Sequence, residues 1–144
     1  MGHSPLLGPV VALVAWSLLM LVWMAIARAG AFRRLGVSLR TIPRGARGDT
    51  LDRTSEAQAQ WKAHNYNHLM EQPTIFYAVV LALAIMGLDS GLNVALAWGY
   101  VGLRIFHSIV QATVNIVAIR LSLFMLSTLC LAGLTLHAAA ALLH

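Results

Sequence analysis

Four apolar stretches, each long enough to cross a lipid bilayer, dominate the sequence. They cover about residues 5–29, 63–86, 94–118 and 121–143. A helix that spans a bilayer needs about 20 mostly apolar residues, because lipid offers no hydrogen-bond partner to an open backbone. We therefore predict an all-α membrane protein in which residues 1–144 form a single domain, a bundle of four transmembrane helices.

The composition agrees with this class and argues against a soluble fold. Hydrophobic residues make up 59% of the chain and charged residues only 10%, whereas a soluble domain carries about a quarter charged residues. The first apolar stretch has no Lys or Arg before it and is too long for a signal peptide, so we predict a retained membrane helix. The single cysteine, Cys130, cannot form a disulfide within the chain and is interpreted as a packing residue.

The positive charge is concentrated in one segment rather than spread over a surface. The formal net charge is +5, and eight of the ten Lys and Arg residues lie between Arg28 and Lys62. The positive-inside rule assigns such a segment to the cytoplasm, so we predict a basic cytoplasmic loop over about residues 30–60. Anionic lipid headgroups are its expected partners, and no nucleic acid is implied. A lid or anion clamp is the alternative interpretation of this loop.

A polar stripe opens the second span. His64, Asn67, His68 and Glu71 follow the i, i+3, i+4, i+7 spacing that places residues on one face of a helix. A carboxylate inside an apolar segment usually faces protein or a water-filled cavity and has a partner. Pro73 follows shortly afterwards, and we predict a kink just beyond Glu71, because proline cannot donate a backbone hydrogen bond.

A second polar stripe lies on the third span, and its depth matches the first. At 1.5 Å per residue, Glu71 and Arg104 lie within roughly 5 Å of the same level if the two helices are antiparallel. We therefore predict that Glu71 contacts Arg104 and that Arg120 lies at the cytoplasmic mouth between the stripes. The residues of the second stripe are Arg104, His107, Ser108, Gln111 and Asn115.

Two interpretations of these stripes remain open. Polar contacts between membrane helices contribute less than about 1 kcal/mol on average, so stability is a weak reason for so many of them. The alternative to such packing is a polar pocket, open to the cytoplasm, for a charged water-soluble ligand beside an apolar surface for a lipophilic small molecule. His64 and His68 have helical spacing for a metal, but no thiolate or second carboxylate completes the set, and we expect no metal site.

The layout resembles that of the MAPEG family, membrane-associated proteins in eicosanoid and glutathione metabolism. The stretch from Asn65 to Tyr77 looks like the bacterial branch. The positive-inside rule places both termini outside. The resemblance implies a homotrimer in a bacterial inner membrane, with glutathione bound between adjacent subunits in the cytoplasmic half. The residues that carry the resemblance are Ala63, His64, Asn67, Glu71, Pro73, Arg104 and Arg120.

The resemblance also implies roles for particular residues. Asn67 and Glu71 correspond to a buried Asn and Glu of the family, and Arg104 to an arginine midway along the third helix. Arg120 corresponds to the arginine that stabilises the glutathione thiolate, and is the predicted catalytic residue. A thiol is mostly protonated at neutral pH, and a neighbouring guanidinium favours its thiolate. The residues expected to bind glutathione are His64, Asn67, Glu71, Arg104, Gln111 and Asn115.

Some positions depart from the family pattern. Three residues separate Asn67 from Glu71, where the better-studied members have two, and Gln111 replaces a tyrosine that several members carry. Our leading hypothesis is an integral membrane glutathione-binding protein with transferase or peroxidase activity on lipophilic electrophiles. The alternative is a non-catalytic membrane subunit that uses the fold for lipid or protein packing, within a larger membrane complex.

Overall fold

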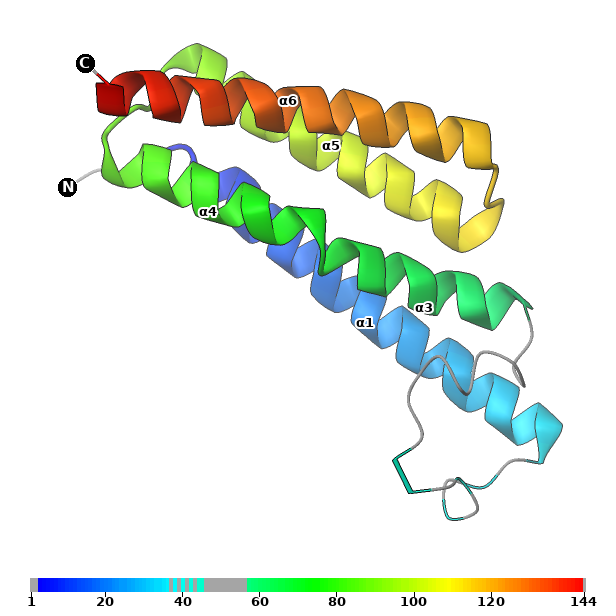
Figure 1. Ribbon diagram of the computed structural model, residues 1–144. Helices are drawn as coiled ribbons and strands as arrows, with labels where there is room; N and C mark the ends of the chain where they lie inside the picture. The colour runs from blue at the N-terminus through cyan, green and yellow to red at the C-terminus, as the bar shows by residue number, and fades with distance from the viewer. Residues whose placement is uncertain are drawn as a thin grey trace.

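The computed structural model describes residues 3–36, 38, 40, 42, 44–45 and 57–143. All regular structure in these residues is helical, which confirms the predicted all-α bundle (Figure 1). The segment Ala57–Ile85 is broken at Met70 and Glu71 into two helices. The helices are α1 (Leu7–Leu35), α3 (Ala57–Leu69), α4 (Gln72–Ile85), α5 (Gly91–Thr113) and α6 (Val117–Leu143).

The elements run up and down along one common direction (Figure 1). The start of α1, the α4–α5 turn and the end of α6 lie at one end of the bundle, which we call the terminal end. The end of α1, the start of α3 and the α5–α6 turn lie at the other, which we call the basic end because Arg33 and Arg34 lie in the last turn of α1. The short α4–α5 and α5–α6 turns make these helices antiparallel neighbours, whereas a longer segment joins α1 to α3.

Three helical segments of the described chain are long and apolar enough to cross a membrane: α1, the broken segment Ala57–Ile85, and α6. At 23 residues α5 is about 34 Å long, which also suffices. Its mean hydropathy is lowered by polar side chains that are buried inside the bundle, whereas Trp98 and Phe106 are exposed on its outer side. We therefore still expect α5 to be the fourth span.

The basic end differs from the predicted boundaries. Helix α1 continues to Leu35 and α3 begins at Ala57, so residues 30–35 and 57–60 of the predicted loop are helical. Gly36 ends α1 with a left-handed φ of 65°, and its N–H donates to the carbonyl of Arg33. Glycine adopts this conformation without steric cost, and for this reason it ends helices.

The α5–α6 turn also lies earlier than predicted. We expected the third span to reach residue 118 and the connection to cover about 116–120, but the turn consists of residues 114–116. Asn115 has a φ of 53°, and its N–H donates to the carbonyl of Val110 at 2.7 Å. Asparagine is among the few residues that tolerate a left-handed backbone. Arg120 consequently lies in the first turn of α6 rather than in a loop.

The predicted kink near Pro73 is confirmed as the break between α3 and α4. Because proline has no N–H, the carbonyl of Leu69 has no donor four residues on. The chain tightens instead, with the Met70 N–H donating to the Asn67 carbonyl at 2.9 Å. The break includes Glu71 rather than following it, and the Glu71 carbonyl accepts from the Thr74 hydroxyl at 2.6 Å.

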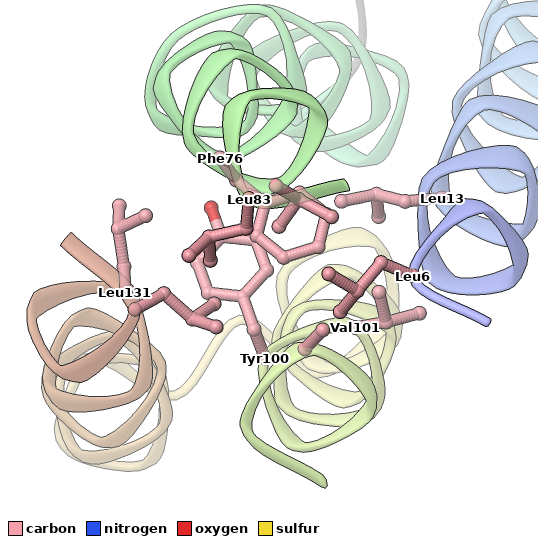
Figure 2. Packing of buried hydrophobic residues seen from close by; sticks show 10 residues of the cluster. Leu6, Leu13, Phe76, Leu83, Tyr100, Val101 and Leu131 are labelled. Atoms are coloured by element: carbon pink, nitrogen blue, oxygen red, sulfur yellow. The ribbon is translucent and has the colours of Figure 1, made fainter. Parts of the chain in front are cut away.

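The apolar core fills the terminal half of the bundle (Figure 2). Phe76 of α4 stacks on Tyr100 of α5, with ring centroids 4.2 Å apart and an interplanar angle of 9°. Leucines from α6 and from the start of the chain close around this pair. The polar side chains of α3 and α5 are thereby left to the basic half.

Truncation of the central aromatic pair should destabilise the protein. Phe76 is fully buried, so Phe76→Ala should lower the free energy of unfolding by about 3–5 kcal/mol through lost packing and a residual cavity. Ile85→Ala is the control, because Ile85 is 87% exposed and its truncation should change little. Reversible unfolding of both variants in mixed detergent measures the difference. Equal effects would contradict this packing.

Candidate functional site

The face of α3–α4 that turns inward is set by apolar residues beyond the break. Phe76, Val80 and Leu83 are all fully buried and follow one another at steps of four and three residues. The same spacing continued toward the start of the segment leads to Gln72, Leu69 and Asn65, of which Leu69 and Asn65 are buried and Gln72 is half-buried. This buried face is rotated about the helix axis, by about one residue position, from the predicted stripe that contains His64 and Glu71.

Two polar contacts join this inward face to α5. The Asn65 amide donates to the Ser108 hydroxyl at 2.8 Å. One turn further, Arg104 Nη2 lies 3.1 Å from His68 Nδ1 and donates to the His68 carbonyl oxygen at 3.0 Å. Each step along α3 is matched by a step in the opposite direction along α5, as antiparallel neighbours require.

Gln72 makes the third contact and marks the boundary between the polar half and the core. Its Oε1 accepts from the Tyr100 hydroxyl at 3.4 Å, and its Nε2 donates to the Thr128 hydroxyl of α6 at 2.9 Å. Gln72 is the first residue of α4. The start of α4 is therefore hydrogen-bonded to both α5 and α6, about one helical turn before Phe76.

The predicted contact between Glu71 and Arg104 is not formed in the subunit. Arg104 is only 1% exposed, and its hydrogen bonds to described residues go to His68. Its Nε and Nη1 atoms are buried with no partner among these residues. The register differs by one helical turn from the prediction, because the apolar face of α4 and not the polar spacing determines which side of α3 is buried.

Three of the predicted site residues lie on the outer side of α3 and of the break. His64, Asn67 and Glu71 are exposed, and Thr74 continues the same stripe. Glu71 lies at the midpoint of the 29-residue segment Ala57–Ile85, where an exposed carboxylate would face the interior of the membrane. Such a group is costly in lipid, so this outer stripe needs a cover.

A cavity of about 180 Å³ opens at the basic end, between α3, α5 and α6. Arg120 is its cationic side chain, and His68 and His107 also line it. No carboxylate is among the described lining residues, which are His68, His107, Val117, Arg120, Leu121 and Phe124.

Asn115 positions Arg120 rather than lining this cavity. Arg120 Nη1 donates to Asn115 Oδ1 at 2.6 Å, and Arg120 Nε is buried with no partner among the described residues. The left-handed Asn115 therefore both ends α5 and anchors the guanidinium. Gln111 is buried on α5, its Oε1 has no partner in the described part of the chain, and it does not line the cavity either.

The structure thus brings Arg120 and Asn115 together. Arg104 contacts His68 but is not among the residues that line the cavity. It adds contributions from Asn65, His68 and His107 that were not among the predicted site residues. The signal that identifies Asn65 and His68 is the buried spacing of Phe76 and Val80, extended backward across the break.

A family model, that of the MAPEG family, matches residues 6–140. The chain belongs to the MAPEG family. It is therefore a membrane protein of a family in glutathione and eicosanoid metabolism. No curated protein and no solved structure matches the chain.

The Asn65–Ser108 contact can be separated from the exposed stripe by a double-mutant cycle. Asn65→Ala and Ser108→Ala should show a coupling of about 0.6 kcal/mol in the free energy of unfolding, the usual value for hydrogen bonds between membrane helices. Asn67→Ala is the control, because Asn67 is exposed. It should show no coupling to Ser108, and a coupling larger than that of Asn65 would contradict the observed helix face.

Proposed function

We propose that this protein binds glutathione, or a similar thiol, beside Arg120 and activates it toward lipophilic electrophiles, as a transferase or peroxidase. The observation that carries the proposal is the Arg120 guanidinium, which is anchored by Asn115 and faces a cavity with no carboxylate among its described lining residues. A site of this charge suits an anion.

The role proposed for Arg120 is to favour the thiolate form of the bound thiol. A free thiol is mostly protonated at neutral pH, and a nearby cation shifts it toward the thiolate, which is the nucleophile. A guanidinium keeps its charge, so it holds the thiolate without competing for the proton, which leaves to solvent. Leu121 and Phe124 line the same cavity and offer apolar contact to a substrate that arrives from the bilayer.

The size of the cavity argues that one subunit holds only part of the ligand. Small-molecule pockets usually measure about 300–1,000 Å³, whereas this cavity measures about 180 Å³. The outer stripe of His64, Asn67 and Glu71 is a second incomplete site. Glu71 is three residues from His68 in sequence, so it lies within about 5 Å of the cavity in depth.

A homotrimer would complete both halves at once. We propose that the outer stripe of one subunit faces the Arg120 cavity of the next, so that Glu71 binds the ammonium group of glutathione while Arg120 binds the sulfur. Arg104, Gln111 and Asn115 would support the site from within. The basic end would face the cytoplasm of a bacterial inner membrane, with both termini outside, because Lys and Arg favour that side.

A non-catalytic subunit remains the second candidate. The contacts of Asn65 with Ser108 and of Arg104 with His68 are interhelical, and they would serve helix packing without any ligand. The buried Gln111 Oε1, which has no partner among the described residues, favours this alternative because it stands where several members have a tyrosine.

A thiolate titration separates the two candidates. Glutathione added to purified protein in nanodiscs should give a saturable thiolate absorbance near neutral pH, and Arg120→Ala should reduce it at least about tenfold, since it removes the only cation that lines the cavity among the described residues. Arg33→Ala is the charge-matched control, because Arg33 is exposed in the last turn of α1. No saturable signal from intact protein would overturn the thiol proposal.

Subunit mixing tests whether two copies share one site. Arg120→Ala and Glu71→Gln subunits should each be inactive alone, but a mixed oligomer should recover thiolate formation wherever an intact Arg120 faces an intact Glu71. Two affinity tags select the mixed oligomers, and size-exclusion chromatography checks assembly. Mixed oligomers that stay as inactive as either parent would contradict the shared site.

A further inference from the structure

The hydrogen bond between Arg104 and His68 fixes the tautomer of the imidazole. Arg104 Nη2 lies 3.1 Å from His68 Nδ1. A guanidinium can only donate hydrogen bonds, so Nδ1 must be the acceptor and carries no proton. A neutral imidazole has one N–H, and that proton is then on Nε2. His68 is consequently an Nε2–H donor for as long as this contact persists.

The ring is also held in place on its other sides. The same Arg104 Nη2 donates to the His68 carbonyl oxygen at 3.0 Å, so one guanidinium fixes both the backbone and the side chain. The ring of His107 lies 5.1 Å from that of His68, and Phe124 packs against it edge-on at 5.5 Å. Arg104 itself is 1% exposed and cannot turn away into solvent.

The free edge of His68 faces the cavity that contains Arg120. His68 is half-buried and lines this cavity. Among the described residues its Nε2 has no hydrogen-bond partner, and it is not one of the buried unpartnered atoms either. The Nε2–H is therefore open to the space in which the Arg120 guanidinium lies.

We propose that His68, held as its Nε2–H tautomer by Arg104, donates a second hydrogen bond to the anionic group that Arg120 binds. This inference rests on the proposed function, in which that group is a thiolate. Arg120 supplies the charge, His68 supplies a directed neutral donor, and Arg104 is a positioning residue that acts through His68. The thiol proton is released to solvent. The other titratable group that lines the cavity is His107.

An imidazole in this position changes what the site selects. A carboxylate beside Arg104 would neutralise the guanidinium and repel an anion in the cavity. A neutral N–H donor does neither, so Arg120 and His68 Nε2 both present hydrogen-bond donors to the cavity. Such a set stabilises a thiolate more than a protonated thiol or a thioether, because the charged acceptor forms the stronger hydrogen bonds.

Two substitutions test the roles of the two ring nitrogen atoms of His68 separately. In His68→Asn the amide oxygen takes the place of Nδ1 and still accepts from Arg104, but the donor into the cavity is lost. In His68→Gln the amide nitrogen takes the place of Nε2 and preserves the donor. We expect His68→Asn to lower thiolate binding about tenfold and to shift the midpoint of thiol ionisation up by about one pH unit. His68→Gln should retain most of both.

S-Methylglutathione distinguishes a directed donor from a general loss of structure. It carries no ionisable thiol, so its affinity should be the same for the wild-type protein and for His68→Asn. Equal thiolate binding by His68→Asn and the wild-type protein would overturn the role of His68 and leave the proposed function standing. Absence of any thiolate in the wild-type protein would overturn both.

A measurement on the unsubstituted protein covers the case in which a variant fails to fold. Nitrogen-15 NMR of histidine-labelled protein in nanodiscs reports which ring nitrogen carries the proton, with the spectrum of whichever His68 variant folds as the assignment control. The proposal expects a neutral His68 with the proton on Nε2. A proton on Nδ1, or a doubly protonated ring, would overturn it.

Discussion

A buried guanidinium at a helix break is the contact on which the polar half of this protein depends. A helix leaves its last carbonyl groups without partners, and Pro73 extends that deficit across residues 70 and 71. Arg104 approaches from α5 and donates to the His68 carbonyl at the end of α3. The charge is costly to bury in a membrane protein, and the open carbonyl is costly to leave unpaired, so each group offsets part of the cost of the other.

The two halves of the bundle differ in how their helices are packed. In the terminal half, Phe76 and Tyr100 stack within a core to which α1, α4, α5 and α6 contribute (Figure 2). Gln72 then closes this core with hydrogen bonds to α5 and α6. Apolar packing is concentrated in the terminal half. The basic half, in which hydrogen bonds join α3 to α5, contains a cavity and buried polar atoms without partners among the described residues.

Three of the four predicted spans correspond to described helices that are long and apolar enough to cross a membrane, but the buried face of α3 was predicted wrongly. Hydropathy predicts membrane helices well, because lipid leaves the backbone few alternatives. Spacing alone cannot distinguish His64, Asn67 and Glu71 from Asn65, His68 and Gln72, since both sets lie on a helical stripe. The buried positions of Phe76 and Val80 decide between them through packing. The early end of α5 was equally hidden, because it depends on a left-handed asparagine that hydropathy does not register.

The subunit by itself leaves two deficits of opposite charge. Arg120 faces a cavity too small for a tripeptide and lined by no carboxylate among the described residues, while Glu71 is exposed at mid-segment, where lipid cannot solvate it. A charged side chain inside the membrane that lacks a partner of opposite charge is costly, and this applies to both Arg120 and Glu71. In the proposed assembly, the outer stripe of one copy would cover the cavity of another and remove both deficits, whereas a ligand or a lipid bound to one surface alone would remove only one. The cost of exposing the Glu71 carboxylate to lipid is therefore itself an argument for the proposed assembly.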